Sequence, residues 1–184
     1  MTDAGGVDSA DGVRPVNGIL QRGLYFEEFE TGARYLHRPG RTATEADNVL
    51  FSSLTMNTQA LHLDAAYSAS QPFGQRLMNS MWTLATMVGA SVTQLTQGTL
   101  VAQLGLSDIA FPAPLLHGDT LYTETEILEK RRSASRPGQG IVTMRHTGRN
   151  QDGTVVASAT RVALVWCAPT DDAPTDAPSS EPAA

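Results

Sequence analysis

The chain has 184 residues, a length typical of one domain with flanking segments. Its 13 Lys and Arg against 19 Asp and Glu give a formal net charge of −6, and 41% of its residues are hydrophobic, enough for a real core. The acidity belongs to the ends, because residues 1–20 carry a net charge of −2 and residues 167–184 carry −4. The remaining stretch, 21–166, is formally neutral with 12 acids and 12 bases, so it lacks the basic surface of a nucleic-acid-binding protein.

The number and spacing of the cysteine and histidine residues exclude further kinds of site. One cysteine, Cys167, excludes an internal disulfide framework and a Cys-rich zinc site. The four histidines are scattered without HxH or HxxxH spacing, so we expect no metal. No apolar run approaches the roughly 18 residues of a membrane helix. The N-terminus has neither the basic nor the apolar region of a secretory signal, and we therefore expect a cytoplasmic protein without a membrane partner.

Composition also predicts the domain boundaries. Residues 1–20 are rich in Gly, Asp and Ser, and residues 167–184 contain four prolines among small polar residues. Segments of this kind bury too little apolar surface to order themselves. We expect a disordered arm at 1–20, one domain at 21–166 and a disordered tail at 167–184.

Two helices are predicted in the first half of this domain. A short helix follows Thr44, a plausible N-cap with Asp47 three residues on, and it has an apolar face. That face consists of Val49, Leu50, Phe51 and Leu54. A longer helix is expected over 79–95, with apolar residues on all sides, so it should be central. Its apolar residues are Met81, Trp82, Leu84, Ala85, Met87, Val88, Val92 and Leu95.

The second half changes to strand character. Segments 100–111, 120–130, 140–147 and 154–165 are rich in Val, Ile, Thr and Tyr, and 121–128 partly alternates as a half-buried strand does. Asn150-Gln-Asp-Gly153 is typical of a hairpin turn, and Pro137-Gly138 of a loop. A buried helix followed by an antiparallel meander predicts an α+β fold, with a curved sheet wrapped around a helix. A cone of the nuclear-transport-factor type is the alternative.

The run FSSLTMNTQALH at residues 51–62, followed by Ser68, carries a family resemblance. It resembles the signature of the MaoC-like (R)-specific enoyl-CoA hydratases, which is aromatic, aliphatic, small hydroxyl, Gly-Asp-x-Asn-Pro, aliphatic, His, then Ala or Ser. The matching residues are Phe51, Leu54, Thr55, Leu61, His62 and Ser68. Asn57 stands where the family has its catalytic Asp.

Two further segments extend the likeness over about residues 24–166. The segment FGQRLMNS at 73–80 resembles the approach to the central helix, where the family often has His-Gly at the places of Asn79 and Ser80. The segment FPAPLLHGDTL at 111–121 resembles a turn in which Pro and Gly-Asp-Thr recur. The resemblance implies a hot-dog fold, in which an antiparallel sheet wraps a long central helix.

The reaction implied by the resemblance is the addition of water to an enoyl thioester, or its removal. This chemistry needs a base for the water, an acid for the α-carbon and a dipole against the developing enolate oxygen. We expect His62 to transfer the protons, since imidazole titrates near neutral pH. Asn57 would hold the water, which it can hydrogen-bond but cannot deprotonate. The two side chains converge only if 55–61 is a loop, since five helical residues would separate them by about 140°. Asn57 is equally well explained as a turn residue.

Further residues are expected to contact the substrate. Ser80 opens the predicted central helix, where a backbone N–H can face the thioester oxygen, although a plain N-terminal turn needs the same residue. The resemblance also brings Gly74 and Asn79 to the substrate. Arg131 and Arg132, in the basic cluster at 130–136, are candidates for the CoA phosphates. A solvated hairpin tip is the simpler explanation of that cluster.

The sequence therefore predicts a hydratase or dehydratase acting on an enoyl-CoA or 3-hydroxyacyl-CoA thioester, with a weaker likeness to enzymes of branched or mesaconyl-type acyl groups. CoA belongs to the substrate, and no other cofactor is expected. The family pairs hot-dog domains, which implies a homodimer or a higher homo-oligomer. The rival hypotheses are a catalytically silent acyl-CoA-binding subunit and a hot-dog thioesterase.

Overall fold

The computed structural model describes residues 20–169. Five strands and five helices, with a short 3-10 turn before them, make up this part of the chain. In chain order they are η1 (Phe26–Glu28), β1 (Arg34–Thr42), α1 (Glu45–Leu54), α2 (Ala60–Leu63), α3 (Ala65–Ala69), α4 (Ser80–Ala90), α5 (Val92–Leu95), β2 (Leu100–Ala110), β3 (Thr120–Arg132), β4 (Gln139–Arg149) and β5 (Val155–Trp166).

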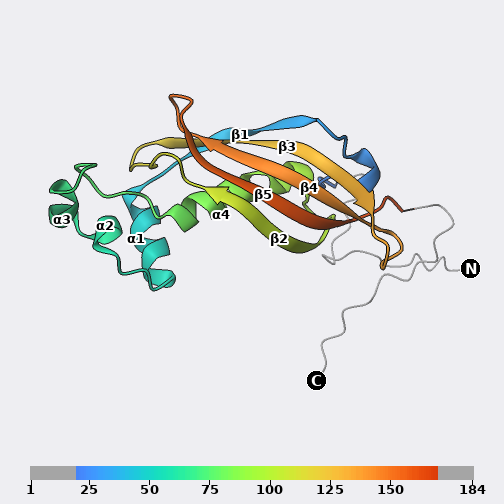
Figure 1. Ribbon diagram of the computed structural model, residues 1–184, viewed down its shortest axis with the longest axis horizontal. Helices are drawn as coiled ribbons and strands as arrows, with labels where there is room; N and C mark the ends of the chain where they lie inside the picture. The colour runs from blue at the N-terminus through green and yellow to red at the C-terminus, as the bar shows by residue number, and fades with distance from the viewer. Residues whose placement is uncertain (1–19, 170–184) are drawn as a thin grey trace, which may run out of the picture.

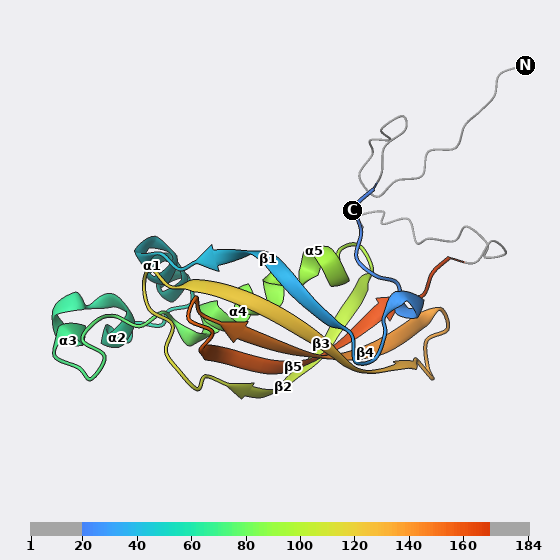
Figure 2. The same ribbon diagram turned by 90° about the horizontal axis from the view of Figure 1, so that it is seen from above.

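The strands form one antiparallel sheet that curves around α4 (Figures 1 and 2). Their order is β1-β3-β4-β5-β2, so β1 and β2 are the edges. Burial alternates along β3 and β4, as expected for a sheet with one face on the core. The predicted α+β fold, a hot-dog with the sheet wrapped around a central helix, is confirmed.

The predicted strands agree with the observed ones to within a few residues, and Asn150–Gly153 forms the turn between β4 and β5. Gly153 has φ +81°, and the Asn150 side chain accepts hydrogen bonds from the N–H groups of Asp152 and Thr154. The sequence did not predict β1. Its core-facing residues are few, and its register with β3 shifts between His37 and Arg41.

The central helix is shorter than predicted and is not covered on all sides. It ends at Ala90, and Ser91 separates it from the single turn α5. Trp82, Leu84 and Met87 are buried, but Met81 is 48% exposed and Ala85 is also exposed. A stripe of α4 beside the β2 edge therefore lacks a partner among the described residues.

Helix α1 begins as predicted, but of its predicted apolar face only Phe51 packs against the core. Thr44 accepts a hydrogen bond from the N–H of Asp47, whose carboxylate accepts in return from the N–H of Thr44, forming a capping box. The buried residues are polar, Asn48 and Ser52, whereas Leu50 is 62% exposed. Hydrogen bonding at Asn48 decides the orientation of this helix rather than apolar periodicity.

A band of polar side chains divides the core into two apolar clusters. On the inner face of the sheet, His37 Nε2 lies 2.8 Å from Thr125 Oγ1, which lies 2.8 Å from His146 Nδ1. Arg161, only 2% exposed, continues the band on β5, between the buried Ala159 and Ala163. Its Nε and Nη1 atoms have no hydrogen-bond partner among the described residues. Such a band is unusual, because buried polar groups are costly unless paired.

The predicted disordered ends lie almost entirely outside the described residues. The predicted tail began too early, because Cys167 donates its N–H to the Gly138 carbonyl at 2.9 Å and Ala168 donates to the Glu27 carboxylate at 2.8 Å. Over residues 20–169, no helix is both long and apolar enough to cross a membrane.

Candidate functional site

His62 lies on the short helix α2, at one end of the molecule (Figure 1). Residues 55–59, which lead to it, are not helical, and this was the condition for Asn57 and His62 to converge. There Met56 adopts φ +57°, and the N–H of Asn57 donates to the carbonyl of Ser52 at 2.9 Å. His62 Nδ1 lies 2.9 Å from the Leu77 carbonyl oxygen. A carbonyl can only accept, so Nδ1 carries a proton, and in the neutral form of the ring the lone pair lies on Nε2.

The imidazole borders a cavity of about 380 Å³. Most residues on its wall have apolar side chains, and the polar residues on it are His62, Ser80 and Thr83. The wall is contributed by α2, the 73–78 segment, the first turn of α4, the 111–115 loop and the start of β5. The apolar residues are Leu61, Phe73, Leu77, Met78, Phe111, Pro112, Ala113, Pro114, Leu115 and Val156. A base with a free nitrogen on an apolar cavity is suited to proton transfer at a hydrocarbon chain.

The N-terminus of α4 lies on the same cavity. Asn79 is the N-cap: its Oδ1 accepts from the N–H of Met81 at 3.0 Å, and its Nδ2 donates to Ser52 Oγ at 3.2 Å. Ser80 follows as the first residue of the helix and lines the cavity. Helix N-termini carry partial positive charge, so this end of α4 can stabilise negative charge that develops on a bound carbonyl. The structure thus brings His62 and Ser80 to one cavity.

Asn48, which sequence analysis missed, connects these two parts. It is fully buried on α1, and its Nδ2 lies 3.0 Å from the His62 carbonyl oxygen and 2.9 Å from that of Leu77. Its Oδ1 accepts from the N–H of Asn79 at 2.9 Å. The available signal was the polar pair Asn48 and Ser52, four residues apart on one helical face.

His117 also contacts Asn48. Its Nε2 lies 3.0 Å from Asn48 Nδ2, so Nε2 accepts and Nδ1 carries the proton. Burial lowers the pKa of His117, the nearby Arg76 lowers it further, and Glu45 opposes both. Arg76 and Glu45 form an ion pair beside it. His117 is therefore held neutral at the edge of the site.

The other predicted site residues do not line this cavity. Asn57 Oδ1 accepts from the N–H of Gln59 at 3.2 Å, which is the turn interaction considered as its alternative role. Asn79 is 2% exposed and its side chain serves as the cap described above. Gly74 is an exposed turn residue with φ +67°. The water-holding and substrate-binding roles of these residues remain predictions.

Arg131 and Arg132 lie at the far end of β3, opposite α2 and α3 in both views (Figures 1 and 2). Arg132 forms an ion pair with Glu27 at 2.7 Å and donates to the Cys167 sulfur. Within one copy of the described chain, neither arginine reaches the cavity at His62. Their contact with CoA phosphates stays a prediction.

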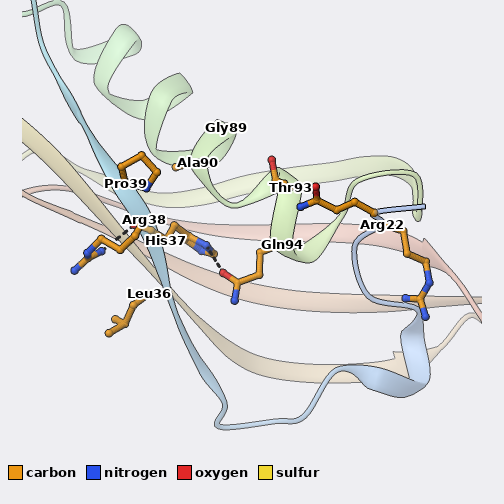
Figure 3. A pocket seen from close by; sticks show the side chains of 10 residues that line it. Arg22, Leu36, His37, Arg38, Pro39, Gly89, Ala90, Thr93 and Gln94 are labelled. Atoms are coloured by element: carbon orange, nitrogen blue, oxygen red, sulfur yellow. Dashed lines mark hydrogen bonds between the residues drawn. The ribbon is translucent and has the colours of Figure 1, made fainter. Parts of the chain in front are cut away.

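A larger hollow of about 760 Å³ lies between β1 and the end of α4 (Figure 3). His37 and Gln94 face each other there, with His37 Nδ1 2.9 Å from the Gln94 amide oxygen. The other ring nitrogen of His37 contacts Thr125, so neither nitrogen is free for catalysis. Gly89 lines this larger hollow and comes nine residues after Ser80 in the sequence. The two residues therefore lie roughly 13 Å apart along the helix. We therefore assign the site to the smaller cavity. Among the described residues there is no group of three His, Cys, Asp or Glu side chains that could hold a metal.

Comparison with known proteins agrees with this fold. The family described as MaoC like domain matches residues 27–150. The chain belongs to this family. A Mycobacterium tuberculosis protein with a solved double hotdog fold superposes on this MaoC-like domain with a TM-score of 0.73 and 26% identity, covering 83% of this chain and 46% of that one.

Curated relatives of this MaoC-like domain include two enzymes of CoA thioesters. Mesaconyl-CoA hydratase of Haloarcula marismortui is 27% identical over 146 residues, which are 79% of this chain and 40% of the relative. Beta-methylmalyl-CoA dehydratase of Chloroflexus aurantiacus is 29% identical over 144 residues, 78% of this chain and 40% of the relative. The chain thus spans less than half the length of both relatives.

Proposed function

We propose that this MaoC-like domain adds water to an enoyl-CoA thioester, or removes it from a 3-hydroxyacyl-CoA, including branched acyl groups of the mesaconyl type. The observation that supports this most is the free Nε2 of His62 on an apolar cavity shared with the N-terminus of α4. The names of the two relatives support the substrate class. CoA is part of the substrate, no further cofactor is invoked, and the proposed location is the cytoplasm.

The proposed mechanism uses one base. His62 Nε2 takes a proton from water while the water oxygen bonds to the β-carbon. The electron pair of the double bond moves toward the thioester oxygen, where the backbone at Ser80 and the positive end of α4 stabilise the enolate. The protonated imidazole then gives its proton to the α-carbon, so the base is regenerated. Dehydration runs through the same steps in reverse.

The experiment uses the whole chain with crotonyl-CoA and mesaconyl-CoA. Loss of enoyl absorbance without release of free thiol is the expected result. Release of thiol would indicate a thioesterase instead. Saturable binding of butyryl-CoA with neither signal would indicate the silent acyl-CoA-binding subunit. That second candidate is favoured by Asn57, which replaces the family's carboxylate and is engaged in a turn.

The proposal includes a homodimer or higher assembly. Its support is the exposed stripe of α4, with Met81 48% exposed, beside the edge strand β2, where Leu104 is 51% exposed. Exposed apolar patches next to an unpaired strand edge commonly mark interfaces. Light scattering should give at least twice the chain mass, and Ala85→Arg on the stripe should reduce it. A monomeric wild type would contradict the assembly but not the chemistry.

A further inference from the structure

We infer that Asn48 is a positioning residue, which holds the imidazole of His62 and the first turn of α4 in the mutual arrangement that the reaction needs. This inference rests on the proposed function. Asn48 does not line the cavity and touches no substrate. It acts through backbone groups on both sides of the site, all within 3.0 Å of its amide.

The first connection fixes the base. The Leu77 carbonyl accepts from His62 Nδ1 at 2.9 Å and from Asn48 Nδ2 at 2.9 Å. The Asn48 amide therefore holds the acceptor that orients the imidazole. It also contacts the carbonyl of His62 itself. Asn48 thus binds the carbonyl of His62 directly, and it holds the imidazole through the Leu77 carbonyl that both side chains share.

The second connection fixes the start of α4. Asn48 Oδ1 accepts from the N–H of Asn79, and the side chain of Asn79 caps the helix at Met81. Ser80, between these two residues, is the part of the helix that lines the cavity. The same amide thus sets the position of the base and of the helix terminus proposed to stabilise the enolate.

The third connection involves His117. Asn48 Nδ2 has two hydrogens but lies within 3.0 Å of three acceptors, the carbonyls of His62 and Leu77 and His117 Nε2, so at least one hydrogen is shared between two of them. The 116–119 turn that carries His117 follows Leu115, on the cavity wall. Only a side chain with donors and an acceptor at this length can make all these contacts. Asn is a weak helix former, so its place in the middle of α1 gives no local advantage.

Two substitutions at Asn48 separate its functions. Asn48→Asp keeps the acceptor for Asn79 but loses the donors to His62, Leu77 and His117, and Asn48→Leu loses both. We expect kcat for hydration of crotonyl-CoA to fall about 10- to 100-fold, since small misplacements of reacting groups have effects of this size, with KM changed less than about threefold. Asn150→Asp, in the exposed β4–β5 turn, is the matched control and should stay within about twofold of wild type.

A readout independent of turnover is the tautomer of His62, from the ¹⁵N spectrum of histidine-labelled protein. Wild type should show only the Nδ1–H form, and Asn48→Asp a mixture. If wild type lacks hydratase activity, the proposed function fails while this spectrum still tests Asn48. Unchanged kcat and an unchanged tautomer in folded Asn48→Asp protein would overturn the inference.

Substitutions of His117 test the same contact in the case that both Asn48 variants fail to fold. His117→Lys replaces the acceptor for Asn48 Nδ2 with an ammonium donor, whereas His117→Gln offers an amide oxygen in its place. We expect His117→Lys to push the Asn48 amide away from the two carbonyls, so that kcat falls and the His62 tautomers mix, and His117→Gln to keep both near wild type. Equal behaviour of the two His117 variants would overturn the inference.

Discussion

Acidification should destabilise this protein through His146, which is fully buried in the polar band of the core. Burial, together with the nearby Arg161 and His37, lowers the pKa of His146 from 6.5 to about 3. In the unfolded chain the imidazole titrates near 6.5, so between these two values the unfolded state binds the proton and the folded state does not. Stability is therefore present above pH 6.5 and is lost as the pH falls below it.

The size of the loss follows from the two pKa values. At pH 5, protonation favours the unfolded state about 30-fold, because the unfolded imidazole is mostly charged while the folded one stays neutral. This ratio corresponds to about 2 kcal/mol of lost unfolding free energy relative to pH 7.5. His37 has a pKa lowered by burial as well, so its contribution has the same sign.

Urea unfolding at pH 7.5 and pH 5 measures this loss. In His146→Leu the difference between the two pH values should shrink by about 2 kcal/mol relative to wild type, whatever the absolute stability of the variant. Thr125→Val is the matched control, since it removes the hydroxyl that contacts His146 Nδ1 but keeps both histidines. It should lower stability at both pH values and preserve the difference. An equal pH-dependent loss in wild type and His146→Leu would refute the reasoning.

Three further predictions concern the site and the ends of the chain. His62→Ala should lower turnover by about 10²- to 10⁴-fold in a spectrophotometric hydration assay, without loss of secondary structure by circular dichroism, and near-native turnover would exclude His62 as the base. Asn57→Asp should change that turnover little or lower it, because a carboxylate can keep the turn contact with Gln59 but adds a charge to desolvate. An inactive wild type that this substitution activates would contradict that expectation. Deleting residues 1–19 and 170–184 should leave the melting temperature and the light-scattering mass nearly unchanged, and a drop of many degrees would show that one end packs on the domain.

Elements defined by local chemistry were predictable from sequence, as α1 and the β4–β5 turn show. Thr44 caps α1 because its hydroxyl lies three residues before a carboxylate, and Asn150–Gly153 turns because glycine adopts a positive φ there. Strand β1 escaped prediction because it lies at an edge, where Pro39 is tolerated and the register shifts. Its only local apolar signal is Tyr35-Leu36, and Leu36 is 59% exposed.

The candidate site was predictable only in part. His62 and Ser80 lie in two segments that resemble those of the family and follow each other in the same order. The fold brings both residues to one cavity. Asn48 could not be found in this way, since its contacts come from residues 14, 29 and 69 positions away in the sequence. The predicted apolar face of α1 did not include it. Only the tertiary structure shows that hydrogen bonds of the Asn48 amide, rather than apolar packing, hold this face of α1.

Both ends of the described chain leave the domain away from α2 and α3 (Figure 2). At this end the N–H of Ala168 donates to the carboxylate of Glu27, which also forms an ion pair with Arg132. A tether at either end therefore points away from the cavity at His62. Immobilisation on a solid support, an affinity tag or a genetic fusion to another protein should leave the entrance accessible to a large thioester. For biocatalysis, attachment through the ends is the orientation of choice.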